Sequence, residues 1–262
     1  MGTIADIGVY VFEQVNHMSA LSLSVVIPAK NEAKNLPSLI EGINAACAGM
    51  AFEVIVVDDG SDDDSVSVLR TLAENMPHLR VVAHDRSAGQ SAAVHSGVLA
   101  AKSNVICTLD GDGQNPPSEL PKLFGPILKN DGTGRLGLVA GQRVNRQDTA
   151  SKKLASKFAN RLRSWILKDA TRDTGCGLKA FRKDGFLELP YFDHMHRYLP
   201  ALFARAGWEI AHVDVTHKAR EAGVSKYNNL NRALVGITDL MGVAWLLKRA
   251  KKSTASEIDL GH

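Results

Sequence analysis

Apolar runs of strand length alternate with segments of helical periodicity along the first half of the chain, and this pattern constrains the fold most. Residues 23–28 and 52–57 are continuous apolar runs, and residues 35–48 between them place apolar side chains at helical spacing. Strands that are apolar on both faces are typical of a parallel sheet covered by helices. Residues 23–57 therefore predict a βαβ unit.

The same alternation continues through the next eighty residues. Helices are predicted over 66–76 and 89–102, and strands over 80–83, 105–109 and 136–140. The sequence thus predicts an α/β domain with a mostly parallel sheet and helices on both faces. In such a domain the ligand site lies at the carboxyl ends of the strands.

Charge is distributed unevenly along a chain of otherwise ordinary globular composition. The 262 residues are 45% hydrophobic with a net charge of +3, which excludes a fibrous or disordered protein. Residues 1–142 carry 9 basic and 16 acidic side chains, whereas residues 143–183 carry 12 basic and 3 acidic ones. The later segment suits a diphosphate or an anionic membrane surface.

The cysteines, the N-terminal residues and the longest apolar run indicate in which cellular compartment the protein is expected. Cys47, Cys107 and Cys176 are odd in number and far apart, which favours a reducing, cytoplasmic setting. Residues 1–20 lack the features of a signal peptide and are interpreted as a peripheral extension. The apolar run 233–247 contains Asp239 and is shorter than the roughly 20 residues that span a bilayer.

Two helices with basic flanks are predicted in the second half. Residues 153–167 form an amphipathic pattern, which fits either a surface helix packed on the core or an interfacial helix lying on an anionic membrane. Residues 229–249 form the last helix, followed by a basic tail. The expected organisation is an extension at 1–20, a catalytic domain at 21–228, and an amphipathic helix with its tail at 229–262.

Acidic residues follow two of the predicted strands. Asp58 and Asp59 come directly after residues 52–57 and fit either a turn or recognition of a base or ribose; Ser61 and Asp62 are interpreted as turn residues. Asp110 and Asp112, separated by glycine, follow residues 105–109 and fit either a turn or a site for Mg²⁺ or Mn²⁺.

Four motifs in order make the chain resemble the family 2 glycosyltransferases of GT-A fold. They are VVIPAKNE at 25–32, VVDDGS at 56–61, GQSAAVHSG at 89–97 and DGD at 110–112. The segments DGQNPP at 112–117, DTGCGLK at 173–179, HRYLP at 196–200 and REAGVSKY at 220–227 further resemble the dolichyl- or polyprenyl-phosphate sugar synthases. The resemblance covers residues 23–250.

The resemblance implies roles for individual residues. Around the nucleotide sugar it places Pro28, Ala29, Asn31, Glu32, Asp59, Asp110 and Arg143. It places Asp110, Asp112 and Gln114 around a divalent metal and the diphosphate. Many family members carry Tyr where Asn31 stands, a departure that concerns the stacking contact with the base.

Basic residues of the second half are candidates for holding phosphate. Arg143, Arg146, Arg220 and Lys226 fit that role because an Arg fork holds two oxygens and a Lys supplies a point charge. Gly223 and Ser225 beside the last two indicate an ordered loop that closes over ligand.

Further residues take roles by resemblance. His196 and Arg197 fit a helix surface, but the resemblance places them, with Ser225, at the acceptor phosphate. Asp112, Asp173, Arg220 and Lys226 are the expected catalytic residues. Ser91 and His95 are interpreted as structural.

The predicted activity is metal-dependent, inverting transfer of a sugar from a nucleotide diphosphate to a polyprenyl phosphate. The expected partners are the nucleotide sugar, the lipid and the membrane's inner face, not nucleic acid. An acceptor phosphate is already anionic at pH 7 and needs little help from a base. Two alternatives remain: transfer to a hydroxyl with Asp173 as base, and a nucleotide-sugar-binding protein without turnover. Mannose, glucose and galacturonate all stay open.

Overall fold

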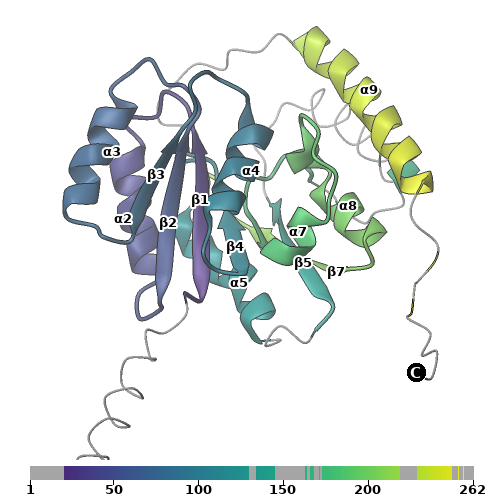
Figure 1. The fold of residues 1–262 in the computed structure, drawn as a ribbon, viewed down its shortest axis with the longest axis horizontal. Helices are drawn as coiled ribbons and strands as arrows, with labels where there is room; N and C mark the ends of the chain where they lie inside the picture. The colour runs from purple at the N-terminus through teal and green to yellow at the C-terminus, as the bar shows by residue number, and fades with distance from the viewer. Residues whose placement is uncertain are drawn as a thin grey trace, which may run out of the picture.

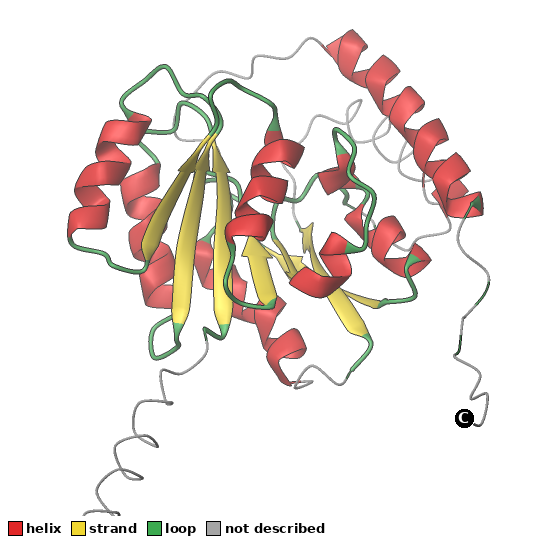
Figure 2. Ribbon diagram, viewed as in Figure 1, coloured by secondary structure: helices red, strands yellow, loops and turns green. Residues whose placement is uncertain are grey.

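The computed structural model describes residues 21–129, 134–144, 173–218 and 229–249, with the single residues 163, 166, 167, 171, 253 and 256. Within these residues there are seven strands: β1 (Leu23–Ala29), β2 (Phe52–Asp58), β3 (Leu79–Ala83), β4 (Val105–Thr108), β5 (Leu136–Arg143), β6 (Lys179–Arg182) and β7 (Glu209–Val215). They form one sheet in the order β3-β2-β1-β4-β6-β5-β7, seen as a fan of arrows in Figure 2. Only β6 runs against its neighbours, so the prediction of a mostly parallel sheet is confirmed.

Helices lie on both faces of this sheet (Figure 1). The described α-helices are α2 (Leu36–Ala46), α3 (Ser65–Glu74), α4 (Gln90–Ala100), α5 (Leu120–Lys129), α7 (Lys183–Leu187), α8 (Leu199–Arg205) and α9 (Asn229–Lys248). Two short 3₁₀ turns, η1 (Pro117–Glu119) and η2 (Met195–Arg197), lead into α5 and α8. The elements predicted over the first 110 residues all form, with ends that differ by one or two residues.

Alternation along each strand divides the core into two layers. In β2, Val54 and Val56 belong to the layer with α2, α3 and α5, whereas Ile55 and Val57 belong to the layer with α4 and α8. All four side chains are fully buried. Because successive side chains of a strand point to opposite faces, a strand covered on both sides must be apolar throughout. This is why the continuous apolar runs identified the central strands.

The second half contains elements that periodicity did not reveal. Helix α5 holds Pro121 and Pro126, residues that ordinarily mark turns and helix ends. Strand β6 is four residues long and enters the sheet antiparallel, between β4 and β5, although it follows both in sequence. Helix α8 and strand β7 complete this part. The sequence did not predict these four elements.

Other expectations lie outside the described residues. These are the extension at 1–20, nearly all of the helix expected over 153–167, and the loop that holds Arg220, Ser225 and Lys226. The final helix does form, as α9, at the outer edge of the molecule beyond α8 (Figure 1). No helix in the described part of the chain is both long and apolar enough to cross a bilayer.

Candidate active site

The candidate site lies where the strand order reverses, at the carboxyl ends of β1 and β4. The chain proceeds outward from β1 to β2 and β3 on one side, and β4 lies on the other side of β1. At such a switch point the loops of adjacent strands part in opposite directions and leave a crevice, where open α/β sheets bind ligands. The topology therefore brings the loops after Ala29 and Thr108 to one place.

The loops after β1 and β2 are fastened to each other through Asn31. Its backbone N–H donates to Ser61 Oγ at 2.9 Å, and its side-chain oxygen accepts from the backbone N–H of Asp62 at 2.9 Å. Asn31 has φ of 60°, a left-handed conformation that Asn tolerates better than most residues. Ser61 and Asp62 are thus turn residues, as interpreted, and the Asn31 side chain is part of that turn.

The neighbouring residues predicted at the nucleoside also line this edge. Glu32 accepts a hydrogen bond from Asn35 Nδ2 at 2.6 Å, which holds its carboxylate near the start of α2. Pro28 and Ala29 lie against Gly111, where a Cβ atom would be 3.2 Å from both the Ala29 Cβ and the Pro28 carbonyl oxygen. A side chain at this position would therefore crowd the approach of the β4 loop to β1.

Asp59, just after β2, organises the loop before α4. Its carboxylate accepts from the backbone N–H groups of Ala88 (2.8 Å) and Gly89 (2.9 Å), from Ser87 Oγ (2.8 Å), and contacts His84 Nδ1 at 2.8 Å. Burial alone raises the pKa of Asp59, but these hydrogen bonds outweigh it and hold that pKa below the usual value. The residue predicted at the nucleoside is therefore also a structural anchor.

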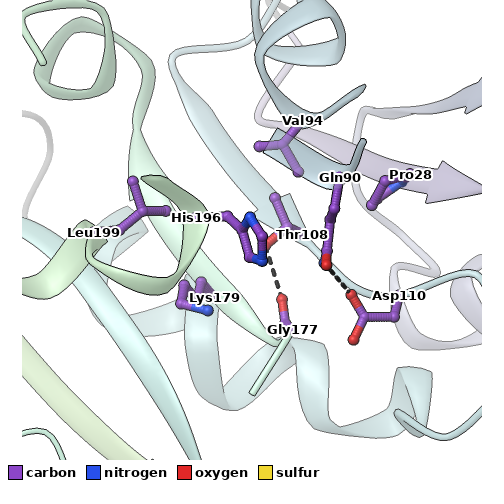
Figure 3. Close-up of a pocket in the computed structure, with 9 residues that line it drawn as sticks. All are labelled: Pro28, Gln90, Val94, Thr108, Asp110, Gly177, Lys179, His196 and Leu199. Atoms are coloured by element: carbon purple, nitrogen blue, oxygen red, sulfur yellow. Dashed lines mark hydrogen bonds between the residues drawn. The ribbon is translucent and has the colours of Figure 1, made fainter. Parts of the chain in front are cut away.

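Asp110, just after β4, has a different environment. It accepts a hydrogen bond from Gln90 Nε2 at 2.7 Å (Figure 3). A second hydrogen bond comes from Asn115 Nδ2 at 3.2 Å. Burial raises the pKa of Asp110, and the nearby negative charge of Asp112 raises it further. Its carboxylate also lies directly against Gly177, in the space that any side chain there would fill.

Asp110, Asp112 and Gln114 together fit a hard divalent cation. They offer carboxylate and amide oxygens, the ligands that Mg²⁺ and Mn²⁺ prefer, and the repulsion between Asp110 and Asp112 is the repulsion that a cation would relieve. No cluster of three or more His, Cys, Asp or Glu suited to a metal occurs among the described residues. A site of two carboxylates leaves room for phosphate oxygens, as is usual for Mg²⁺.

A pocket opens beside Asp110, between α4, β6 and η2. Figure 3 shows the side chains that line it: Pro28, Gln90, Val94, Thr108, Asp110, Gly177, Lys179, His196 and Leu199. Lys179 is only 4% exposed, and its Nζ donates to the Cys176 carbonyl oxygen. Burial lowers the pKa of Lys179, while the negative charge of Asp110 opposes that shift.

His196 enters the same pocket from η2. Its Nδ1 is 2.7 Å from Ser91 Oγ, so Ser91 has the structural role expected of it and fixes the imidazole ring. Burial, together with the charge of Lys179, lowers the pKa of His196 well below its usual value, so the ring is neutral at pH 7. Arg197, the residue paired with His196 in the prediction, is half-buried on the same turn.

Two residues predicted to act separately form one ion pair. Arg143 Nε and Nη2 donate to the two carboxylate oxygens of Asp173 at 2.6 and 2.9 Å. The hydrogen bond to Asp173 raises the pKa of Arg143. The pair joins the end of β5 to the DTGCGLK segment and presents a side chain of each sign close to Asp110.

Sequence reasoning missed three residues of this site. Gln90 and Asn115 donate to Asp110, and Lys179 lies behind it. All three fall inside quoted motifs, yet only the antiparallel insertion of β6 beside β4 brings Lys179 to Asp110. Nothing in the linear sequence reveals that pairing.

The fold and the site define an α/β protein whose switch point carries an acidic pair, Asp110 and Asp112, that fits a divalent cation. Residues 24–189 match the family described as glycosyl transferase family 2, and the chain belongs to that family. Both the α/β GT-A fold and the family membership predicted from the motifs are confirmed.

Two curated relatives are similar over most of the chain. A dodecaprenyl-phosphate galacturonate synthase from Rhizobium johnstonii is 34% identical, over 88% of this chain and 69% of its own length. An undecaprenyl-phosphate 4-deoxy-4-formamido-L-arabinose transferase from Enterobacter sp. is 39% identical, over 79% of this chain and 62% of its own length. The chain thus spans roughly two thirds of the length of these relatives.

Solved structures share the fold at lower sequence identity. Glucosyl-3-phosphoglycerate synthase from Mycobacterium tuberculosis, in complex with Mn²⁺, uridine diphosphate and phosphoglyceric acid, is 20% identical with a TM-score of 0.64 and covers 90% of this chain and 81% of its own. Mannosyl-3-phosphoglycerate synthase from Rubrobacter xylanophilus is 15% identical with a TM-score of 0.65 and covers 90% and 77%.

Proposed function

We propose that this protein transfers a sugar from a nucleotide diphosphate donor to a polyprenyl phosphate, with inversion at the anomeric carbon. The observation that carries the proposal is the half-buried pair of Asp110 and Asp112 at the switch point, whose mutual repulsion a divalent cation would relieve. The two curated relatives are named for polyprenyl-phosphate products, which supports the acceptor class.

In this proposal the residues at the strand ends hold the donor. The nucleoside lies against Pro28, Ala29, Asn31, Glu32 and Asp59, and the diphosphate lies near Asp110, Asp112, Gln114 and Arg143. A bound Mg²⁺ or Mn²⁺ neutralises charge that develops on the leaving diphosphate. Gln90 and Asn115 would hold the Asp110 carboxylate in place before the cation binds, since each donates to one of its oxygens.

The acceptor side of the site combines neutral and basic groups. His196 lines the pocket together with Asp110. The proposal assigns His196, Arg197, Arg220, Ser225 and Lys226 to the acceptor phosphate and the leaving group. A neutral His196 serves as a hydrogen-bond donor to phosphate and contributes no positive charge. The positive charge would come from the arginines and lysines.

The Arg143–Asp173 pair favours a phosphate acceptor over a hydroxyl acceptor. Transfer to a hydroxyl requires a base, and Asp173 is the candidate that the sequence indicated. Both of its oxygens accept from Arg143, which makes the carboxylate a weaker proton acceptor. A phosphate nucleophile needs no such base.

We further propose that residues 229–262 attach the protein to the cytoplasmic face of the membrane. In α9 the side chains of Ile237, Met241 and Trp245 are 57%, 69% and 61% exposed. They are spaced by four residues and so form one stripe along the helix, called the apolar stripe below. Lys248 and Arg249 follow directly, which suits an anionic surface. The catalytic domain in this proposal is residues 21–228.

Product analysis tests the proposed activity. The protein is incubated with several radiolabelled nucleotide sugars, Mg²⁺ or Mn²⁺, and either undecaprenyl phosphate or undecaprenol, and the lipid is extracted. We expect label in the lipid only with the phosphate, since the alcohol is a far weaker nucleophile without a base. Equal labelling of both acceptors would favour the hydroxyl reaction, and donor binding without labelling would favour a non-catalytic binding protein.

Vesicle flotation tests the attachment. We expect binding to anionic vesicles that weakens in high salt and weakens again in Trp245→Ser. Leu99→Ser is a matched control, because Leu99 is a large exposed apolar side chain, 56% exposed, on α4 rather than α9. Equal loss in both variants would argue against the apolar stripe as the lipid contact.

A further inference from the structure

Helix α9 has a second apolar face, which packs against the domain, whereas the apolar stripe is exposed to solvent. Val243 is 2% exposed, and Leu240, Ala244 and Leu247 pack with it against the cluster that contains α8. Residues 240, 243, 244 and 247 follow the spacing of a packed helix face. One side of α9 is therefore packed against the domain, whereas the side chains of the apolar stripe are more than half exposed.

Polar contacts extend the packed face of α9 to the segment that lines the pocket. Asp239 Oδ2 lies 3.1 Å from His194 Nδ1, and the Tyr198 hydroxyl donates to the Gly236 carbonyl oxygen at 3.5 Å. His194 directly precedes η2, and Tyr198 directly follows it. The two contacts thus hold η2 from both of its ends, and η2 carries His196.

The His194–Asp239 pair is partly shielded from water. Asp239 is 18% exposed and His194 is 32% exposed. Asp239 Oδ2 has no hydrogen bond within the described part of the chain, so its 3.1 Å approach to His194 Nδ1 is an ion-pair contact that is charged when the imidazole is protonated. Burial raises the pKa of Tyr198, and the negative charge of Asp239 raises it further, which places that carboxylate close to η2. Removing either partner leaves the other with an unbalanced polar group in a partly buried place.

The backbone of His194 also indicates a held position. Its φ of 64° and ψ of 7° are left-handed, a conformation that non-glycine residues seldom adopt unless their surroundings impose it. The other charged group facing the ring is Asp193, whose Oδ2 is 3.7 Å from His194 Nε2. On the pocket side, Ser91 of α4 fixes His196. Residues 194–198 therefore lie clamped between α4 and α9.

We propose that His194 and Asp239 are a positioning pair through which the seating of α9 on the bilayer sets the position of His196 in the pocket. The inference rests on the proposed function, which supplies the lipid surface and the acceptor phosphate. A ligand shifts an equilibrium between two states by its difference in affinity for them, so a bilayer that binds the apolar stripe favours the orientations of α9 in which the stripe contacts lipid. Because Asp239 of α9 contacts His194, a change in the orientation of α9 changes the position of η2 and of His196.

Hydrogen exchange on anionic vesicles tests the coupling without reference to turnover. Phosphatidylglycerol vesicles are added to the full chain, and backbone exchange is measured in peptides that cover residues 192–199. We expect slower exchange in the native protein on vesicles. Asp239→Asn and His194→Gln should float with vesicles as the native protein does but lose that protection, and Asp239→Glu should restore part of it.

Kinetics supply a second readout. The ratio of kcat with vesicle-embedded undecaprenyl phosphate to kcat with a short, water-soluble prenyl phosphate should fall about tenfold in Asp239→Asn, a coupling of ordinary size. The donor KM should stay unchanged. Glu74→Gln, an exposed carboxylate of α3, is the matched control and should alter neither ratio nor exchange. The double variant of His194 and Asp239 should show the same loss of protection and the same fall in the kcat ratio as each single variant.

Each outcome has a defined meaning. Native protein that does not bind vesicles, or binds without protection of residues 192–199, would overturn the inference, and so would variants that keep both protection and the kinetic ratio. Variants that lose thermal stability are judged at a temperature where circular dichroism shows them folded. A different result would separate the two proposals. If vesicles slow the exchange of residues 192–199 in a way that depends on His194 and Asp239, but the protein transfers no label to lipid, then the proposed acceptor is wrong and the coupling stands.

Discussion

Asp59 and Asp110 follow the two strands that flank β1, yet their surroundings differ. Asp59 accepts from two backbone N–H groups, a hydroxyl and an imidazole, and its pKa is lowered. Asp110 accepts from two side-chain amides, lies close to Asp112, and its pKa is raised. Backbone donors are set in place by folding, whereas amide side chains can turn aside for a ligand. The comparison separates an anchor of the fold from a group prepared for a cation.

The largest effect should come from the carboxylates prepared for the cation. Asp112→Asn and Asp110→Asn should each lower turnover by roughly 10²- to 10³-fold, because charge on the leaving diphosphate is then poorly neutralised. Steady-state rates with labelled donor measure the loss. Glu74→Gln is the control, since Glu74 is an exposed carboxylate at the end of α3. Full activity of native protein in EDTA would contradict this assignment.

A smaller effect should appear in the response of stability to metal. Saturating Mg²⁺ or Mn²⁺ at about 100 times Kd should stabilise the native protein by about 2.7 kcal/mol. Asp110→Asn should lose most of this gain, yet should be no less stable than the native protein without metal, because it removes a buried charge beside Asp112. Thermal unfolding with and without metal measures both. A metal-free variant that unfolds well below the native protein would show that Asp110 anchors the fold after all.

Asp59→Asn should act on stability instead, by roughly 1–3 kcal/mol, because one of its two acceptor oxygens is lost among buried donors. The lowered pKa fixes the pH dependence. The stabilisation is present above the pKa of the unfolded chain, near 4, and is lost as pH falls through the lower folded pKa. Urea unfolding of both proteins from pH 7 down to pH 3 should therefore show their difference shrinking. A constant difference would contradict the assignment.

The smallest effect should come from a single neutral donor to Asp59. Ser87→Ala removes the hydroxyl at 2.8 Å and should cost about 1 kcal/mol, since the other donors remain. The same urea experiment measures it. Ser67→Ala on α3 is a control, because that side chain is exposed and remote from Asp59. A loss as large as that of Asp59→Asn would mean that the hydroxyl organises the whole loop.

The first half of the fold was predictable because its signals are local. A strand such as β2 is covered on both faces and must be apolar at every position, so Val54 through Val57 identify it directly. Strand β6 is four residues long and begins with a buried lysine, Lys179, so it lacks that pattern. Its place depends on antiparallel pairing with residues far away in sequence, which no local propensity encodes.

The candidate site divides in the same way. Asp110, Asp112 and Asp59 were predictable, since each follows a recognisable strand and carries the charge that the chemistry needs. Lys179 was missed because only β6 brings it to Asp110. The pairing of Arg143 with Asp173 was equally hidden, since the sequence assigned Arg143 to phosphate and Asp173 to catalysis, each on its own.

The place of β6 in the sheet also bears on the order in which the molecule folds. β1, β2 and β3 pair with one another and β4 pairs with β1, whereas β5 is joined to β4 only through residues 179–182 of β6. Contacts between distant residues form late, because the loop between them must close first. We therefore expect β1, β2 and β3 to pair early during folding. Asp110 should stay exposed to solvent until residues 179–182 form β6 beside β4, so the carboxylate of the proposed cation site is among the last groups to become enclosed.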